Sequence, residues 1–319
     1  MRRLKRLGIL LVIVLLVFAL MFALPKPRFK KENPWLAQDG KPLVMAHAGG
    51  KGLFPGNTFS AFEYSYNLGV DVLEMDVQMT EDNILVLRHG ENQTGNIRSM
   101  SNCDTVIWKE TYQYLYDNCN FGYNYQAEDE SYPYRDLTQQ EWIDAKVYLT
   151  TLEELFIEFG NTTLYNIEIK ADADAWRTET VDQLYLLLDQ YDLFDNVLVA
   201  TSFEDISIYI DEIYPEMFLS ASHNEAQNMI IKSYTFTNLF YKPGQYNSLQ
   251  IPTSFNLPVI NELNLSTRLL IFNAHRHNMA VHYWTINDED EMRRLINLGC
   301  DGIITDYPKL LLDILNEEE

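Results

Sequence analysis

With 319 residues, 47% of them hydrophobic, the chain is long and apolar enough for one large α/β domain or two average ones, which excludes intrinsic disorder. Residues 1–31 hold 8 of the 24 lysines and arginines and no acidic residue, so residues 32–319 carry a net charge of −30. Such a charge repels nucleic acid and attracts divalent cations, so we expect no nucleic-acid partner; the sequence predicts no particular protein partner.

The N-terminal segment is typical of an uncleaved signal anchor. Eighteen uncharged and nearly all apolar residues, 7–24, follow a short basic tail, 1–6, and precede Pro25. A helix of about this length crosses ~30 Å of hydrocarbon. The run is longer than the apolar part of most signal peptides and lacks a small-residue cleavage pattern, although a cleaved signal peptide is the alternative. We expect a single-pass membrane protein with a juxtamembrane linker over 25–41. Because only six residues precede the span, we expect the catalytic domain, 42–319, outside the cytoplasm.

From residue 42 onward, short β-rich runs alternate with helical patterns, which predicts parallel strands joined by crossover helices. The predicted strands are 43–49, 72–77, 84–89, 164–170, 197–202, 217–222, 248–252, 281–286 and 302–305. The predicted helices are 58–67, 151–159, 174–190, 204–213, 267–278 and 288–298. Thr58 and Asp288 are suitable N-caps for the first and last of these helices.

Nine strands are one too many for an eight-stranded barrel, and the short turn at 80–83 accounts for the extra one. A parallel connection needs a dozen residues or more, so the strand after this turn has to run antiparallel to the strand before it. The strand 84–89 is therefore the returning arm of a hairpin at the barrel mouth. The predicted fold is a (β/α)₈ TIM barrel with a hairpin and an insertion after strand 2, preceded by one transmembrane helix.

The insertion, residues 90–150, contains eleven aromatic residues and few periodic apolar runs. Loops of this length in a compact domain are usually functional lids or folded substructures. Its aromatic side chains either pack it against the barrel or, in part, line a groove for an acyl chain or a lipid head group. Cys103 and Cys119 either pair in an extracellular setting or remain free thiols.

Ionisable side chains gather at the predicted carboxyl ends of the first strands, and in a (β/α)₈ barrel these ends form the active-site face. The residues are His47, Glu74, Asp76, His89, Glu168 and Lys170. Glu74 and Asp76 share one face of their strand, because side chains alternate along it. Two buried carboxylates repel each other unless a cation lies between them.

The side chains of this group suit a metal site with general acid and base catalysis. Three carboxylates suit one hard divalent cation, Ca²⁺ or Mg²⁺. Two histidines suit a general acid and a general base, and a lysine beside Glu168 can hold a phosphate oxygen. The sequence therefore predicts a metal site with acid and base groups on either side of it.

Six motifs in this order resemble those of the glycerophosphodiester phosphodiesterases, and together they cover nearly all of 43–313. They are HAGG at 47–50, the stretch from NT to LRH at 57–89, NIEIK at 166–170, SFED at 202–205, YWTIND at 283–288 and GCDGIITDYP at 299–308. Three more motifs resemble the membrane-anchored branch that acts on lysophospholipids as a lysophospholipase D. These are YPYR at 132–135, TLEELF at 151–156 and SLQIP at 248–252.

The resemblance implies a role for each candidate residue. It implies three metal ligands, Glu74, Asp76 and Glu168. It also implies an acid/base pair, His47 and His89. Lys170 would contact the phosphate, and Trp284 would form a wall of the glycerol pocket. The substrate's glycerol hydroxyl would attack phosphorus while one histidine takes its proton and the other protonates the leaving alcohol. Water would then open the cyclic intermediate. The products would be an alcohol and a glycerol phosphate, or lysophosphatidic acid from a lysophospholipid.

Three positions depart from the family pattern. Ala48 stands where the family motif HRG has arginine, Gly56 where PENT has glutamate, and Gly90 where HD has aspartate. Lys51 or Lys170 is a candidate replacement for the missing guanidinium. The departures leave an alternative open: an anchored, catalytically weak binding protein for phosphodiester polymers or lipid head groups. A phospholipase C-like or sphingomyelinase D-like enzyme on a similar barrel would differ in the bond that is cleaved.

Overall fold

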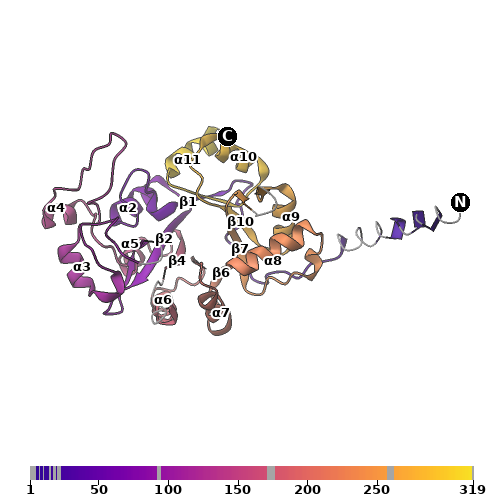
Figure 1. Ribbon diagram of the computed structural model, residues 1–319, viewed down its shortest axis with the longest axis horizontal. Coiled ribbons are helices and arrows are strands. Elements are labelled where there is room, and N and C mark those ends of the chain that lie inside the picture. Colours follow the sequence, from indigo (N-terminus) through magenta and orange to yellow (C-terminus); the bar gives the residue numbers. More distant parts are fainter. Residues whose placement is uncertain are drawn as a thin grey trace.

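The computed structural model describes residues 5–6, 8–9, 11–13, 16, 19, 23–91, 95–170, 177–256 and 262–317. Eight parallel strands form a closed barrel at the centre of the body (Figure 1). They are β1 (Leu43–Ala46), β2 (Val72–Met79), β4 (Leu164–Ile169), β5 (Val197–Thr201), β6 (Phe218–Ser220), β7 (Tyr246–Ile251), β10 (Ala280–Tyr283) and β11 (Gly302–Thr305). Each strand pairs with the next along the chain, and β1 pairs with both β11 and β2, which closes the ring. The predicted TIM barrel is confirmed.

The ninth strand of the sheet, β3 (Leu85–Leu87), pairs antiparallel with the end of β2, as the short turn predicts. Val77 lies opposite Leu87 in this hairpin, so β3 leads the chain back along the upper part of β2. The strand predicted over 84–89 is shorter than expected, and His89 lies just beyond it.

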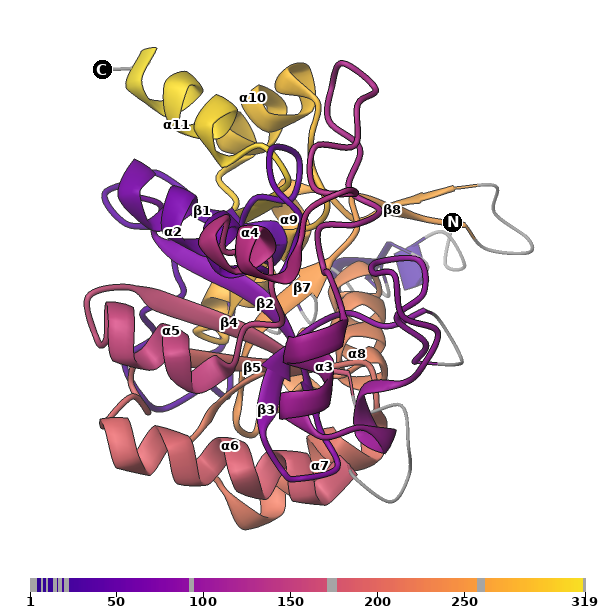
Figure 2. The same ribbon diagram turned by 90° about the vertical axis from the view of Figure 1, so that its left-hand side faces the viewer.

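The helices cover the outside of the barrel (Figure 2). They are α2 (Phe59–Leu68), α5 (Leu152–Phe159), α6 (Arg177–Tyr191), α7 (Glu204–Ile213), α8 (His223–Tyr234), α9 (Arg268–Arg276), α10 (Glu289–Leu298) and α11 (Pro308–Glu317). The sequence analysis missed α8 and α11. Asp288 caps α10 by accepting from the Glu291 amide, whereas Thr58 makes no side-chain capping bond to α2.

Strand β2 shows how the sequence divides between the two faces of the barrel wall. Leu73, Met75 and Val77 pack outward in the main core between sheet and helices, whereas Val72 packs in a second apolar cluster inside the barrel. Because side chains alternate, the inward positions above Val72 belong to Glu74 and Asp76. All eight residues of the strand are buried, as expected for a parallel sheet covered on both faces.

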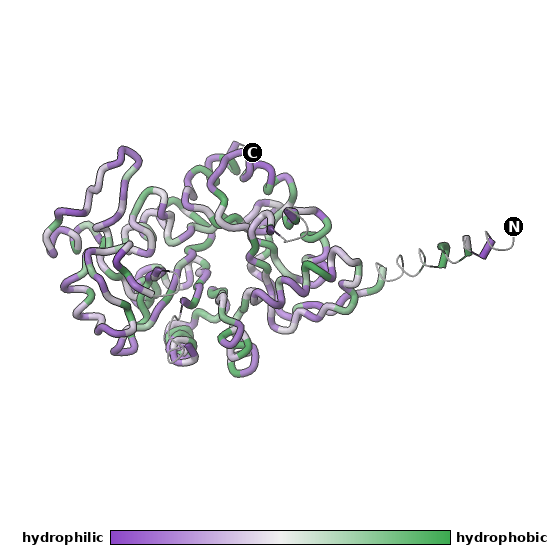
Figure 3. The backbone as a smooth tube through the Cα atoms, in the orientation of Figure 1, coloured by the Kyte–Doolittle hydropathy of each residue, from purple (hydrophilic) through white to green (hydrophobic). Residues whose placement is uncertain are grey.

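The insertion between β3 and α5 is a folded substructure. It contains η2 (Ile107–Lys109), α3 (Tyr112–Asn118) and α4 (Gln139–Asp144). A small apolar cluster with a disulfide between Cys103 and Cys119 holds it together; the cluster includes Ile97, Ile107, Leu115 and Phe121. Its outer loops have a largely hydrophilic trace (Figure 3). Phe121 and Trp142 are buried, Tyr114 and Tyr132 are exposed, and its other aromatic side chains are half-buried, so they contribute in part to packing.

The segment expected to be a linker, 25–41, closes the floor of the barrel. Phe29 and Trp35 are buried against the inner apolar cluster, which includes Val72 and Phe218. The His282 ring contacts the Trp35 carbonyl oxygen at 2.9 Å, and the Asn33 amide donates to the carbonyl oxygens at 247 and 278. These contacts lie at the amino ends of the strands, so the segment is bound to the domain over much of its length.

The anchor predicted over 7–24 falls on a stretch in which only scattered residues are described. Within the described part of the chain, no helix has the length and apolar character needed to cross a membrane. The anchor therefore remains a prediction.

Candidate active site

Three carboxylates form the centre of the site. One ligand oxygen each of Glu74, Asp76 and Glu168 lies within 4.8 Å of the others. The strand register explains this, because Asp76 on β2 pairs directly with Glu168 on β4, and Glu74 is two residues earlier on the same face. Glu74 and Asp76 are 4% and 3% exposed. The site has the donor set of a hard divalent cation, so the predicted ligand group is brought together as expected.

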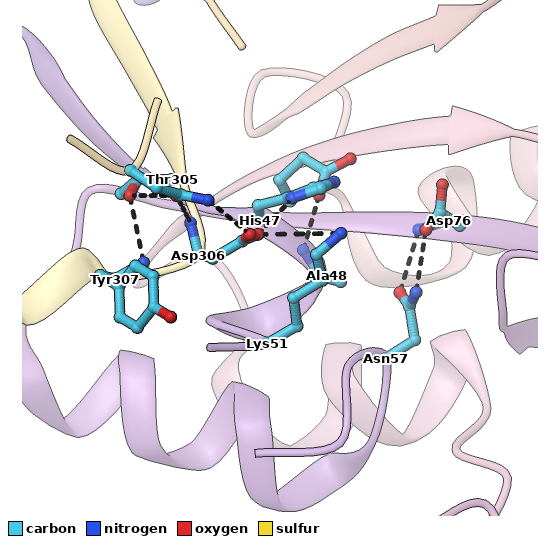
Figure 4. Close-up of polar contacts among 10 residues, drawn as sticks. His47, Ala48, Lys51, Asn57, Asp76, Thr305, Asp306 and Tyr307 are labelled. Carbon is cyan, nitrogen blue, oxygen red and sulfur yellow. Dashed lines mark hydrogen bonds and ion pairs between the residues drawn. The ribbon is translucent and has the colours of Figure 1, made fainter. Parts of the chain in front are cut away.

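Each buried carboxylate accepts a hydrogen bond that helps to fix its orientation. The Ala48 amide donates to Glu74 Oε2 at 2.7 Å, and the Asn57 side chain donates to Asp76 Oδ2 at 2.9 Å. Asn57 Oδ1 also accepts from the Asp76 amide at 3.1 Å, so Asn57 clamps that residue from both sides (Figure 4).

The first predicted strand ends earlier than expected, and this makes the bond to Glu74 possible. The chain leaves the extended conformation after Ala46 and forms the turn η1 (His47–Gly49), in which Ala48 has φ of +47°. Gly49 follows with φ of +77°, and a Cβ atom there would lie 2.9 Å from the Phe62 amide of α2. The turn therefore depends on glycine at this point and aims the Ala48 amide at the carboxylate cluster.

The carboxylates of the cluster repel one another electrostatically. Burial raises the pKa of Glu74 to about 7; repulsion from Asp76 adds to this, while His47 and the Ala48 amide oppose it. Lys170 Nζ lies 2.6 Å from Glu168 Oε1 and 3.6 Å from Asp76 Oδ1. Burial disfavours the charged ammonium, but these carboxylates outweigh it and raise the pKa of Lys170. The lysine thus neutralises part of the cluster's charge.

His47 is held by a carboxylate that sequence reasoning left without a role. Its Nδ1 lies 2.6 Å from Asp306 Oδ1, just beyond β11 (Figure 4). Asn287 donates to the other oxygen of Asp306 at 2.7 Å. Burial alone would lower the pKa of His47, but the charges of Glu74 and Asp306 outweigh it and leave the pKa raised. Asp306 therefore orients the ring and leaves Nε2 for a substrate.

His89 lies directly after the hairpin arm and is half-buried. Its Nδ1 is hydrogen-bonded to the carbonyl oxygen of Gly90, and Gln78 on β2 donates to the carbonyl oxygens of Arg88 and His89. The ring is thus oriented by main chain where the family motif offers aspartate at position 90. As for His47, Nε2 remains for a substrate.

Lys51 Nζ lies 3.8 Å from Asp306 Oδ1, the carboxylate oxygen that holds His47. It packs beside the two positions where the family's charged residues are missing: a Cβ atom on Gly56 would lie 2.8 Å from Lys51 Cβ and 3.1 Å from Ala48 Cβ. Arg88 is buried and donates to the carbonyl oxygens of Gly56 and Met100, so its guanidinium is already used by the main chain. Lys51 thus fills the space that the two small residues leave.

Trp284 follows β10 and is 47% exposed. It borders a cavity of about 610 Å³ that also reaches Glu168. The predicted pocket wall and Glu168 therefore border the same cavity, although β10 lies across the barrel from β4 in the strand order.

Two polar residues that hold the site in place, Asn57 and Asp306, had no assigned role in the sequence analysis. Asp306 follows the last barrel strand, and residues that follow strand ends are candidates in a TIM barrel. That position was the available signal. Asn57 precedes α2, and only the tertiary structure brings it to Asp76.

A closed (β/α)₈ barrel with a carboxylate cluster and two histidines at its mouth defines a TIM-barrel enzyme with a candidate cation site. Residues 47–310 match the model of the glycerophosphoryl diester phosphodiesterase family, and the chain belongs to that family. The protein is accordingly a phosphoric diester hydrolase. Members of this family are generally dependent on a divalent metal, in agreement with the carboxylate cluster.

Curated relatives and solved structures extend this assignment over the domain. The chain is 24% identical over 277 residues to a glycerophosphodiester phosphodiesterase of Bacillus altitudinis, covering 86% of this chain and 98% of the relative. It is 24% identical over 292 residues to human lysophospholipase D GDPD3, covering 85% and 84%. The glycerophosphoryl diester phosphodiesterase domain of Mycobacterium tuberculosis Rv2277c superposes with a TM-score of 0.71 at 16% identity, covering 88% and 100%. A phosphodiesterase of Oleispira antarctica, in complex with the product sn-glycerol-3-phosphate, gives 0.63 at 21%, covering 86% and 97%.

Proposed function

We propose that this protein is a membrane-anchored, metal-dependent enzyme that hydrolyses glycerophosphodiesters or lysophospholipids to an alcohol and a glycerol phosphate or lysophosphatidic acid. The observation that carries the proposal is the convergence of Glu74, Asp76 and Glu168 at the barrel mouth, where β1 leads to His47 and the β2–β3 hairpin leads to His89. Family membership supports the hydrolysis of glycerophosphodiesters.

The two histidines would divide the proton transfers between them. A free glycerol hydroxyl attacks phosphorus as one imidazole takes its proton at Nε2. The bond from phosphorus to the leaving oxygen breaks, and the other imidazole donates a proton to that oxygen. Water then opens the cyclic phosphodiester with the two roles reversed. Asp306 keeps His47 in the orientation this requires, and the Gly90 carbonyl does the same for His89.

Glu74, Asp76 and Glu168 would hold one divalent cation, Ca²⁺ or Mg²⁺. When bound, such an ion neutralises negative charge on phosphoryl oxygens. Lys170, which pairs with Glu168 in its absence, would turn to a phosphate oxygen. Lys51 would supply the positive charge that the family's arginine provides.

The test is product analysis with the purified full chain in nanodiscs, given a deacylated glycerophosphodiester and a lysophospholipid, with and without chelator. We expect release of glycerol phosphate and lysophosphatidic acid that stops on chelation and returns with Ca²⁺ or Mg²⁺. His47→Ala and His89→Ala should each reduce the rate by ~10²–10⁴-fold. Phosphocholine or another phosphorylated leaving group as the product would instead favour phospholipase C-like cleavage.

The departures at Ala48 and Gly90 favour a second candidate, an anchored protein that binds phosphodiesters and turns them over weakly. Full-chain protein that binds a glycerophosphodiester in a metal-dependent way but releases no product over hours would support this candidate.

For the location, we propose a single membrane span over 7–24 with the barrel on the extracytoplasmic side. A disulfide between Cys103 and Cys119 is expected in an oxidising compartment and supports this side. Because residues 29–36 are bound to the barrel floor, the span would join the domain at the amino ends of the strands, and the active site would face away from the bilayer. Protease added to intact producing cells should degrade the barrel; protection until the cells are lysed would reverse the orientation.

A further inference from the structure

The cavity beside Trp284 extends well beyond the space that the phosphodiester needs. It starts at Glu168 in the barrel mouth and passes over the ends of β5, β6 and β7. It then continues between α8 and the small hairpin of β8 (Ser254–Phe255) and β9 (Leu263–Asn264). Figure 2 shows β8 projecting from the barrel body. Its volume of about 610 Å³ lies within the ~300–1,000 Å³ typical of ligand sites.

The lining of this cavity changes from polar to apolar along its length. The part at the strand ends carries small polar side chains, which are Thr201, Ser202, Ser220, Ser222 and Gln250. The part beyond the barrel ring is lined mainly by apolar side chains, with Gln227 of α8 as a polar member; the apolar ones are Ile230, Ile231, Phe255, Leu263 and Leu265. Ile231 and Phe255 are 59% and 45% exposed, so apolar surface that water would otherwise cover is available to a ligand.

We propose that this cavity binds the single acyl chain of a lysophospholipid whose phosphodiester lies at the carboxylate cluster. This rests on the proposed function and names its substrate class. The order of the lining matches such a molecule, because a polar head next to Glu168 leaves its hydrocarbon tail along Ile230 and Phe255. A deacylated glycerophosphodiester would leave the apolar half empty.

The proposed chemistry also favours one acyl chain over two. The first step needs a free glycerol hydroxyl to attack phosphorus, and a lipid acylated at both positions has none. A lysophospholipid keeps one such hydroxyl and one chain. A lipid with one chain also binds a bilayer only weakly and reversibly, so it can reach a site that faces away from the membrane.

The aromatic insertion is a less suitable acyl site. Its aliphatic side chains Ile97, Ile107 and Leu115 are buried in its own cluster with Phe121. It lies at one end of the long axis of the molecule, whereas α8 and α9 lie towards the other (Figure 1). The expectation of an acyl groove therefore moves from residues 90–150 to α8 and the β8–β9 hairpin.

The test uses the full chain in nanodiscs with a series of lysophospholipids of increasing acyl length and one deacylated glycerophosphodiester. We expect kcat/KM to rise by roughly two- to fourfold per added methylene, mainly through KM, until the cavity is filled. Ile230→Gln and Phe255→Ser should lower the ratio of long-chain to deacylated kcat/KM at least ~10-fold, the loss of a few buried methylenes. The matched control is Phe240→Ser, since Phe240 is 65% exposed and lies outside the cavity. Because all variants are measured in the same nanodiscs, partitioning of the lysophospholipid into the bilayer affects them equally.

Turnover of the deacylated substrate with no dependence on chain length, or equal ratios in all variants, would overturn the acyl site and leave the proposed function intact. If no phosphodiester is turned over, the proposed function fails. Equilibrium dialysis of the same lysophospholipids with the full chain then decides the cavity separately. Binding that strengthens with chain length and weakens in Phe255→Ser supports it, and binding without these trends overturns it.

Discussion

Asp306, on the loop after the last barrel strand, holds His47, on the turn after the first, with 2.6 Å between Oδ1 and Nδ1. Residues at opposite ends of the domain sequence thus form one unit, because β1 and β11 are neighbours in the closed barrel. The carboxylate both fixes the imidazole and contributes to the raised pKa of His47.

Asp306→Asn should therefore lower kcat by ~10–100-fold with little change in KM, as is usual when the partner of a functional histidine is removed. The pKa of His47 should fall, so the limb of the pH–rate profile that reports this residue should move to lower pH. Asp313→Asn is the control, because Asp313 is an exposed carboxylate paired with Lys309 on α11. An unchanged profile would mean that Asp306 is only structural.

Metal binding should weaken as the pH falls below about 7. In the metal-free protein, burial and the neighbouring Asp76 raise the pKa of Glu74 to about 7. Below this pH a proton competes with the metal, so the apparent affinity should fall by up to ~10-fold per pH unit. Isothermal titration with Ca²⁺ or Mg²⁺ between pH 8 and pH 5.5 (about one to two units on either side of that value) measures this. Glu74→Gln should bind more weakly and lose the pH dependence due to this group.

The raised pKa of Glu74 also predicts how the stabilisation of the fold by metal depends on pH. A carboxyl whose pKa is higher in the folded than in the unfolded state stabilises the fold when protonated. The stabilisation that Glu74 contributes is complete below pH 4.5, the ordinary pKa of a glutamate side chain, and is lost as the pH rises through about 7. The metal-free protein loses stability over this window, whereas the bound cation compensates the charge. The increase in Tm on adding metal should therefore be larger at high pH than at low pH, and an increase that is independent of pH would contradict Glu74 as a ligand.

Lys51→Ala should raise KM for a glycerophosphodiester by roughly 10-fold, about the ~1.4 kcal/mol expected for one charge-assisted hydrogen bond to phosphate. Lys51→Arg should retain most of the affinity. Lys309→Ala removes an exposed lysine that pairs with Asp313 and serves as the control. Equal KM values in all three variants would assign the phosphate contact to Lys170 alone.

The disulfide of the insertion should contribute measurably to stability. Cys103 and Cys119 are 16 positions apart, and closing a loop of this size stabilises a fold by ~3 kcal/mol in the chain-entropy description. Cys103→Ser/Cys119→Ser should shift the first urea transition to lower concentration. Reductant should shift the wild-type protein in the same way and leave the double variant unchanged, since the remaining thiol, Cys300, is buried and unpaired. A transition insensitive to reductant would contradict the bond.

The sequence by itself determined the barrel and the carboxylate cluster. Alternation places Glu74 and Asp76 on one face of a strand, and a four-residue turn at 80–83 permits only an antiparallel return. Both constraints act over a few residues, so they can be read without knowing the rest of the fold. The helix α8 was missed because its sequence, HNEAQNMIIKSY, combines few apolar positions with many polar ones.

Only the tertiary structure decided the contacts between distant segments. Asn57 reaches Asp76 and Asp306 reaches His47 because closure of the barrel brings separate loops together, and no local pattern encodes that distance. Residues 25–41, expected to form a juxtamembrane linker, close the barrel floor for the same reason: Trp35 is fully buried only when all strands surround it. The apolar cavity likewise exists only between α8 and the β8–β9 hairpin, because its walls come from segments that are far apart in the sequence and meet when the chain is folded.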